Sequence, residues 1–426
     1  MRLTQTLYRT SMRYMIKRAW KFRGVPAMPN VVQHKFLREE GIEVENTMAE
    51  KEPLKWNPPV PDDPSIRWFF PKKKEDAKNW QENPLHVFNS GTKLTEALDQ
   101  IRVLTKSQII DGIPKNIESL MDAESMPDEN LLVQRLIMQA HVWDTTYEQL
   151  PRRFNPRVPR WHFKSEKGIP FDKIPKLLLR NLVQLCSSLS HKYPEILMDR
   201  TLTRDHYTNS LLTMAGKPVM VNETLPFLLS SSKDLPIFAD QETVDATVNV
   251  NLPDLDPLSP LLDVLKTHTY DPIESTGWKL ASALNIPHTL FTTYTDYMTQ
   301  EKWLSTDFWT SEQHVAQAVM FAFGRAVARA KAKYGANVTN LPEPVTVQGI
   351  KTDGEKFHFV CFQLNTLNIN SNDGIKNLVW IDKDNYLFHK ILPRRAMLRN
   401  TIYEDFDPSV FRKFLAFFLN GLHIEQ

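Results

Sequence analysis

The sequence predicts an α+β fold in which a mixed sheet is built around a central hairpin, with a long helix before the hairpin and a buried C-terminal helix after it. Two stretches carry this prediction. Residues 345–364 hold two runs of β-branched and aromatic residues that meet at Asp353 and Gly354, a pair whose tolerance of positive φ suits a tight turn. Residues 311–334 repeat small and apolar residues at helical spacing.

The second run of the hairpin is apolar on both faces, which is typical of a central, buried strand. One face carries Phe357, Phe359 and Cys361, and the other carries Val360, Phe362 and Leu364. A third strand is predicted at Leu378–Ile381, and the polar residues 382–385 after it predict a turn.

The helix before the hairpin has both of its ends marked. Thr310 and Gln313 have the spacing of a capping box, and Gly335 follows the last turn as a stop signal. Gly324 lies inside the helix, where glycine costs about 1 kcal/mol relative to alanine, so we expect a close packing contact there. The expected buried stripe consists of Val315, Val319, Ala322, Ala326, Ala330 and Tyr334.

The C-terminal helix is predicted over residues 408–420, after Asp407 and before Gly421. Apart from Arg412 and Lys413 this segment is apolar on most sides, so we expect it to be buried. Together with the long helix and the hairpin it forms a predicted α+β core over residues 306–426.

Two regions precede this core in the globular part of the chain. Residues 85–200 predict a helical region with amphipathic helices near 94–101, which Asp111–Pro114 would end, near 130–143, and after Pro175. Residues 201–305 alternate short apolar runs with polar turns, and they predict an irregular α/β region that folds onto the sheet.

The amino-terminal 84 residues are predicted to lie outside this globular part. Residues 39–84 contain seven prolines and three tryptophans, which predicts an extended arm whose aromatic side chains anchor on another surface. Residues 1–38 contain nine basic residues and no acidic one, the composition of a mitochondrial transit peptide, with a retained basic arm as the alternative. Without these nine cations the remainder has 43 basic and 50 acidic residues, a formal charge of −7. The protein body is therefore expected to be mildly acidic.

A basic insert at residues 150–168 stands out against that acidic body. Its cations are interleaved with aromatic residues, a combination that suits phosphate pairing and base stacking and so predicts an RNA contact. A solvated basic loop is the alternative. The candidate RNA-binding residues are Arg152, Arg153, Arg157, Arg160, Trp161, Lys164 and Lys167, with Lys72, Lys73 and Lys74 as a second basic cluster in the arm.

The sequence carries no signature of a cofactor, metal or catalytic site. Only 13 glycines occur, and neither a dinucleotide nor a phosphate-binding glycine motif is present. The two cysteines, Cys186 and Cys361, fall inside apolar elements, which favours a reducing compartment without structural disulfides. His141 and His191 have no second ligand at metal spacing. No apolar run approaches the ~18 residues that a membrane span needs.

One enzymatic alternative starts from the acidic residues near the hairpin, because a helix followed by a hairpin is also the scaffold of metal-dependent nucleases. The strand lysine of such sites is missing, since Phe357 stands two places after Glu355. A soluble matrix enzyme of degenerate nuclease-like type is therefore only the alternative reading. The acids concerned are Asp353, Glu355, Asp373, Asp382 and Asp384.

Four segments resemble the large-subunit protein thirty-seven family of the animal mitochondrial ribosome. They are FAFGRAVARAKAKYG at 321–335, PVTVQGIKTDGEKFHFVCFQLNTLNI at 344–369, GIKNLVWIDKDNYLF at 374–388 and FRKFLAFFLNG at 411–421. The resemblance is specific over residues 311–421, patchy over 85–310 and absent from the first 80 residues. The basic insert is longer here than in the family, so no role is carried over to it.

The resemblance implies a non-catalytic protein of the mitochondrial large ribosomal subunit, located in the matrix. It implies contacts with large-subunit rRNA and with other large-subunit mitoribosomal proteins. One expected neighbour is a similar, paralogous mitoribosomal protein, known as programmed cell death protein nine, as a pseudo-symmetric heterodimer partner. The family implies no catalytic residues and no cofactor.

Overall fold

The fold is that of a computed structural model of the 426-residue chain. The structure describes residues 39–41, 83–146, 148–150, 167–214, 216–256, 263–267, 285–295, 309–336, 338–390 and 403–422. The chain divides into two compact units, residues 1–73 and 74–426. The fold below is that of the second unit. The predicted transit peptide and nearly all of the predicted proline-rich arm lie outside the described residues.

Within the described residues, nine strands form one mixed sheet with the order β2-β11-β10-β9-β8-β6-β1-β7, and β5 pairs with β6 beside this path. Neighbours β8 and β9, β1 and β6, and β2 and β11 are parallel, whereas the other pairs are antiparallel. The strands are β1 (Asn83–Phe88), β2 (Ser107–Asp111), β5 (Arg200–Met214), β6 (Lys217–Ser231), β7 (Asp263–Thr267), β8 (Ile286–Thr293), β9 (Asn340–Thr352), β10 (Lys356–Thr366) and β11 (Asn377–Tyr386).

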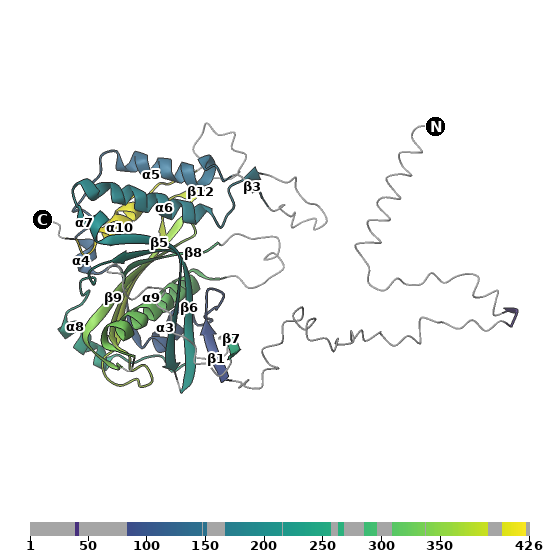
Figure 1. The fold of residues 1–426 in the computed structure, drawn as a ribbon, viewed down its shortest axis with the longest axis vertical. Helices are drawn as coiled ribbons and strands as arrows, with labels where there is room; N and C mark the ends of the chain where they lie inside the picture. The colour runs from purple at the N-terminus through teal and green to yellow at the C-terminus, as the bar shows by residue number, and fades with distance from the viewer. Residues whose placement is uncertain are drawn as a thin grey trace, which may run out of the picture. The chain divides into compact units, whose positions relative to one another are not determined.

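The sheet curls around α9 on one face and carries a helical layer that contains α5, α6 and α10 on the other (Figure 1). The helices are α3 (Ala97–Leu104), α4 (Lys115–Glu118), α5 (Glu129–Met138), α6 (Ile174–Ser187), α7 (Glu195–Met198), α8 (Gln241–Ala246), α9 (Ser311–Tyr334) and α10 (Pro408–Leu419). A π-helical turn η3 (Gln139–Trp143) and two 3₁₀ turns, η4 (Ser188–His191) and η5 (Thr247–Asn249), extend α5, α6 and α8. Two short ladders pair β3 (Glu148–Gln149) with β4 (Lys167–Gly168) and β12 (His389–Lys390) with β13 (Tyr403–Glu404).

The predicted hairpin is confirmed, and it lies inside the sheet. The pairing of β9 with β10 begins next to the turn, where Thr352 lies opposite Phe357. Gly354 in the turn has φ +101°. As predicted, both faces of β10 are buried: Phe359 packs with the helical layer, whereas Phe362 packs with α9. The hairpin therefore joins the two hydrophobic cores of the fold.

The long helix α9 is confirmed with its capping box, since Thr310 accepts from the Gln313 backbone and the Gln313 side chain accepts from the Thr310 backbone. The predicted stripe is buried except for Tyr334 at its end, which is partly buried. Burial also extends around the whole circumference, because the curled sheet covers the sides that a one-sided amphipathic helix would leave to solvent. Even Gln317 and Arg325 are buried.

Gly324 makes the predicted close contact. A Cβ added there would lie 2.8 Å from Val221 Cγ1 and 3.0 Å from Ser210 Oγ. The helix therefore touches the β5–β6 hairpin at a distance that only glycine permits.

Replacing Gly324 by alanine is expected to lower the free energy of unfolding by about 1–2 kcal/mol, because overpacking a tight core outweighs the better helix propensity. The measurement is chemical denaturation of the variant and the wild type. Ala332→Gly, at an exposed position of the same helix, serves as the propensity control and should cost about 1 kcal/mol. A Gly324→Ala protein more stable than wild type would contradict the contact.

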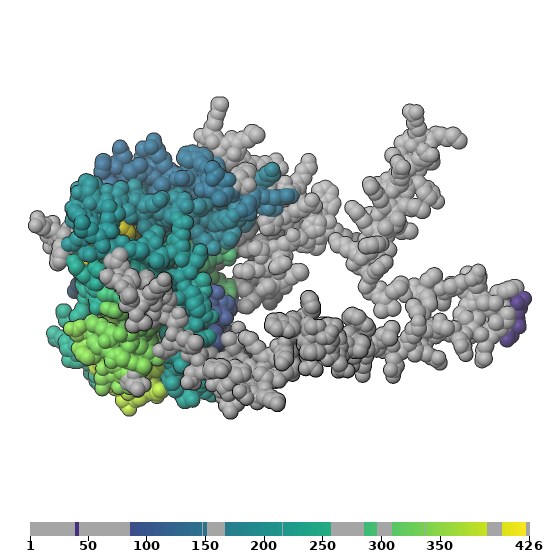
Figure 2. Space-filling view, viewed as in Figure 1, coloured from purple at the N-terminus to yellow at the C-terminus, as the bar shows by residue number. Residues whose placement is uncertain are grey.

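The C-terminal helix is also confirmed, from its cap at Asp407, which accepts from Ser409 N, to its end before Asn420. All of its residues from Phe414 to Leu419 are buried. In the space-filling view only a small yellow area of this part of the chain shows between the teal helices (Figure 2).

Two local predictions were wrong. Residues 382–385 form no separate turn, because β11 continues to Tyr386 and pairs there with β10 after a shift in register. Asp384 has φ +62°, so its turn-like backbone is accommodated within the strand. The helix near 94–101 ends at Leu104, well before Asp111, and residues 107–111 form β2, which pairs in parallel with β11.

Residues 201–305 contain more regular structure than their sequence predicts. β5 and β6, of 15 residues each, form a long hairpin, and β8 lies between β6 and β9 and pairs with both. Their strands belong to the same sheet as the central hairpin.

Candidate functional site

The basic insert begins and ends at a short antiparallel ladder. β3 and β4 pair Glu148 with Gly168 and Gln149 with Lys167. The ladder holds the two ends of the insert side by side next to the layer of α5 and α6 (Figure 1). The insert is therefore anchored at both ends to the helical face of the protein.

Apolar packing fixes this ladder to the body. Leu150 and Ile169, directly beyond its two strands, are 7% and 4% exposed. A Cβ on Gly168 would lie 2.9 Å from Leu150 Cδ1, so glycine lets the two chains approach closely. The surface at the base of the insert is thus held in place by buried side chains.

Charged groups surround the base of the insert. Lys173 Nζ donates to Glu148, and this contact raises the pKa of the lysine. Asp144 accepts hydrogen bonds from Thr146 N and Oγ1 at 2.8 and 2.6 Å, which lower its pKa, and the charges of Arg180 and Lys173 lower it further. Two cations, Lys173 at the N-cap of α6 and Arg180 within it, thus lie near the segment that leads into the insert.

Of the predicted RNA-binding residues, only Lys167 is among the described residues. It lies in β4 and is exposed. The others lie outside the described residues: Arg152, Arg153, Arg157, Arg160, Trp161 and Lys164 in the insert, and Lys72, Lys73 and Lys74 in the arm.

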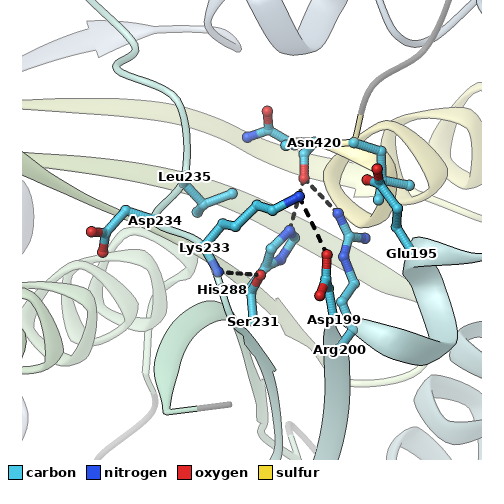
Figure 3. A pocket seen from close by; sticks show the side chains of 11 residues that line it. Glu195, Asp199, Arg200, Ser231, Lys233, Asp234, Leu235, His288 and Asn420 are labelled. Carbon is cyan, nitrogen blue, oxygen red and sulfur yellow. Dashed lines mark hydrogen bonds and ion pairs between the residues drawn. The ribbon is translucent and has the colours of Figure 1, made fainter. Parts of the chain in front are cut away.

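A second polar cluster lies where β5, β6, β8 and the end of α10 meet (Figure 3). Arg200 donates to the carbonyl oxygens of Phe418 and Asn420, the second at 2.8 Å. His288 Nε2 lies 2.9 Å from the same Asn420 oxygen, and Gln348 donates to the carbonyl of Phe417. These groups satisfy the carbonyls that the last turn of a helix leaves without partners.

This cluster is too small to hold a ligand. Its cavity has a volume of about 10 Å³, which is close to the space that one water needs. Burial lowers the pKa of Arg200 to about 10, so the guanidinium stays charged at neutral pH, and burial also lowers the pKa of His288. The arrangement locks α10 onto the sheet rather than forming a reaction site.

A buried ion pair ties α9 to the β5–β6 hairpin. Arg325 Nη2 donates to Glu223 Oε2 at 3.0 Å and lies 3.3 Å from His206 Nδ1. The Arg325 and Glu223 side chains are only 2% and 3% exposed. Burial raises the pKa of Glu223 to about 7 against the attraction of Arg325, and burial next to this cation lowers the pKa of His206 to about 4.

The acids near the hairpin have structural partners. Asp353 accepts from the backbone of Glu355 and Lys356 and so closes the turn. Asp382 pairs with Lys413 of α10, and Asp384 accepts from Ser311 of α9. Within the described ranges no group of three His, Cys, Asp or Glu side chains is arranged to hold a metal ion.

Comparison with known proteins identifies the family. The chain is 32% identical to the large ribosomal subunit protein mL37 of Mus musculus over 350 residues, which cover 80% of this chain and 77% of the relative. The chain belongs to the mL37 family. Similar matches are mL37 of Gallus gallus, at 31% over 362 residues, and mL37 of Bos taurus, at 30% over 367 residues, covering 83% of this chain in both cases. As a member of the mL37 family the chain is a ribosomal protein and not an enzyme.

A family model described as mitochondrial 28S ribosomal protein S30 (PDCD9) matches residues 217–421. This range runs from β6 to α10 and contains the central hairpin and α9. It also contains the polar groups that hold the end of α10, with the exception of Arg200. Its description refers to a small-subunit protein, whereas the relatives are large-subunit proteins. The mL37 matches decide the family because they span four fifths of the chain, whereas the family model matches only residues 217–421. Among the described helices, none is both long and apolar enough to cross a membrane.

Proposed function

We propose that this chain is a structural constituent of the mitochondrial large ribosomal subunit, where it contacts rRNA and neighbouring proteins in support of mitochondrial translation. The observation that carries the proposal is the identity of 32% to mL37 across 80% of the chain. The structure is consistent with a structural role, because its buried polar clusters lock helices onto the sheet and leave no cavity of ligand size there.

The amino terminus supports the mitochondrial location. Residues 1–38 have nine basic and no acidic residues, and we propose that they direct the protein to the matrix as a transit peptide. Import would remove the charge that this segment carries. The protein assembled into the ribosome would then have the formal charge of −7.

RNA contact in this acidic body is assigned to the basic insert. Its cations can pair with phosphates, and its aromatic residues can stack on unpaired bases. A Debye length of about 8 Å at physiological salt keeps this attraction local, so the acidic remainder does not cancel it. The proposed RNA-binding residues are Arg152, Arg153, Arg157, Arg160, Trp161, Lys164 and Lys167, with Lys72, Lys73 and Lys74 in the arm.

The proposed protein partner is the paralogous mitoribosomal protein whose family model matches residues 217–421. Two chains that share this half of the fold can pair with pseudo-two-fold symmetry, since the same surface is present on each. Within the described part of this half, exposed apolar residues suited to such a contact include Ile237 at 53% and Val248 at 47% exposure.

Sedimentation of mitochondrial lysate tests this function. The chain should sediment with the large-subunit peak, and the proposed paralogous partner should appear in the same fractions. A chain found only in the light fractions, away from the large-subunit rRNA, would contradict the proposal.

Changing Arg152, Arg153, Arg157 and Arg160 to alanine is expected to weaken RNA binding and to flatten its dependence on salt. Each lost contact to single-stranded RNA should reduce the slope of log K against log salt by about 0.7. The measurement is a titration of the purified chain with RNA at several salt concentrations. Lys115→Ala with Lys217→Ala, two exposed cations on other elements, is the matched control. An unchanged slope would show that the insert is a solvated loop.

A further inference from the structure

At four places in the sequence an aspartate or asparagine stands directly before a glycine. In such a pair the glycine nitrogen is open to attack the preceding side chain, because glycine has no Cβ to shield it. The pairs are Asp111–Gly112, Asp353–Gly354, Asp373–Gly374 and Asn420–Gly421. All four lie within the described residues, and the fold treats one of them differently from the others.

Hydrogen bonds or burial hold three of these pairs. Gly112 N donates to a carbonyl of β11 at 2.8 Å, and Gly354 N donates to a threonine hydroxyl at 2.9 Å. The Asp353 carboxylate also accepts from two backbone N–H groups. Asn420 is 2% exposed, and its side-chain amide donates to Gln348. Attack at these pairs therefore needs a local opening of the fold.

The fourth pair is open. Asp373 and Gly374 are both exposed in the loop between β10 and β11. Within the described residues the Gly374 nitrogen has no hydrogen-bond partner, and a Cβ on this glycine would meet no atom within 4 Å. The Asp373 carboxylate accepts a 3.3 Å hydrogen bond from the hydroxyl of Ser371 in the same loop. The carboxylate can therefore turn toward the glycine nitrogen without breaking a buried contact.

A buried lysine contacts the peptide group between these two residues. Lys106 is 2% exposed, and its Nζ donates to the backbone oxygen of Asp373 at 2.6 Å and to that of Asn368 at 3.0 Å. When the Gly374 nitrogen loses its proton, negative charge develops on the Asp373 oxygen, because both atoms belong to one conjugated peptide group. An ammonium group already at hydrogen-bond distance stabilises this charge. Lys106 thus favours the reactive form of the glycine nitrogen.

We propose that Asp373 is a site of spontaneous isoaspartate formation in the folded protein. The Gly374 nitrogen attacks Cγ of the protonated Asp373 carboxyl, an N–Cγ bond forms, and the carboxyl hydroxyl leaves with the amide proton as one water. A second water then adds to the backbone carbonyl carbon of Asp373, and the old peptide bond breaks with its electron pair and a proton on the nitrogen. The chain now runs through Cβ and Cγ. One water leaves and one enters, so the reaction needs no oxidant, reductant or cofactor.

The reaction moves a negative charge without changing the net charge. The Asp373 side chain becomes part of the backbone, and the former backbone carbonyl becomes a carboxylate at the position that Lys106 contacts. In the unmodified protein the hydrogen bonds of the Lys106 ammonium go to neutral carbonyls. Isomerisation therefore gives a buried cation an anionic partner, which a buried charge favours.

The test is incubation of the purified full-length chain at mildly acidic pH, followed by digestion and mass spectrometry with electron-transfer fragmentation, which distinguishes isoaspartate from aspartate. Isoaspartate should form at Asp373 at least about ten-fold faster than at Asp111 and Asp353, because each of those pairs must first break hydrogen bonds. In denaturant the three pairs should react at similar rates, since no contact protects any of them. Asp373→Glu should remove the signal at position 373, because ring closure would then need a six-membered ring.

A variant of the buried lysine tests its part in the reaction. Lys106→Met, with a melting temperature showing that it is folded, should slow the reaction at Asp373 by about ten-fold, the effect of one charge-assisted hydrogen bond. The rates at Asp111 and Asp353 should not change. A wild-type rate at Asp373 in this variant would show that Lys106 does not assist the attack. If the folded wild type forms isoaspartate at Asp111 or Asp353 as fast as at Asp373, or if the denatured chain keeps the same ranking, the proposal is wrong.

Discussion

Replacing Arg325 by methionine is expected to lower the free energy of unfolding by about 3–5 kcal/mol, the range seen when one partner of a buried ion pair is removed. Methionine fills much of the space of the guanidinium stem but leaves the Glu223 carboxylate without its cation. Glu223 is 2% exposed and has no access to water to replace the 3.0 Å bond from Arg325. The measurement is urea denaturation followed by circular dichroism.

A second variant tests whether the cost comes from the stranded carboxylate. Arg325→Met combined with Glu223→Leu removes both charges and should recover most of the lost stability, since a buried pair and a well-packed apolar pair are often similar in stability. If the double variant is as unstable as the single one, the ion pair is not the cause. Arg329→Met is the control, because that arginine forms an ion pair with Asp234 at the surface and should cost less than about 1 kcal/mol.

The dependence on pH follows from the raised pKa of Glu223. Its folded pKa of about 7 lies above its ordinary value of 4.5, so the folded state binds the proton more tightly. The resulting contribution to stability is complete below pH 4.5 and is lost as the pH rises through 7. Relative to Glu223→Gln, the wild type should therefore lose about 2–3 kcal/mol between pH 4.5 and pH 8. Comparison with this variant largely cancels the opposite trend of His206, whose depressed pKa of about 4 makes folding less stable as the pH falls.

Replacing Arg200 by methionine is expected to cost about 3–4 kcal/mol, because it removes two charge-assisted hydrogen bonds and leaves the carbonyl of Phe418 without this donor. The guanidinium also lies 5.4 Å from the centre of the Phe418 ring, so packing on the helix is lost as well. Thermal and chemical unfolding of the purified chain measure the effect, and amide exchange of α10 should rise because its last turn is no longer held.

Two further variants test whether the contacts of Arg200 with the α10 carbonyls cause this loss of stability. Arg200→Lys keeps the charge but lacks the planar guanidinium that donates to both carbonyls. The stability of this variant should therefore lie between that of Arg200→Met and that of the wild type. Lys233→Ala removes a neighbouring ion pair with Asp199 in which the side chains are 55% and 31% exposed, and it should change stability by less than about 1 kcal/mol. A loss from Lys233→Ala as large as that from Arg200→Met would show that the surface charges, and not the carbonyl contacts, hold the helix.

The candidate site was predictable only in part. The high density of charged and aromatic residues at 150–168 predicted that this insert is the candidate site. The structure adds the β3–β4 ladder that anchors the insert. The sequence does not mark that ladder, because its two strands are only two residues long and lie on opposite sides of the insert.

What the sequence by itself determined is what local chemistry can specify. Gly354 permits the positive φ of the hairpin turn, the Thr310 and Gln313 pair caps α9, and Asp407 starts α10. The same local segments were enough for the family resemblance. The division of the chain at residues 38, 84, 200 and 305 stays a prediction.

Only the tertiary structure decided which polar residues would be buried. Arg325 lies on a helix whose sequence shows one apolar stripe, yet the curled sheet covers its other sides and brings Glu223 to it across 102 residues. Arg200 lies 218 residues before the carbonyl that it binds. No local pattern marks such residues, because the groups that make their burial favourable come from distant elements, β6 for Arg325 and the end of α10 for Arg200, which become neighbours only when the chain folds.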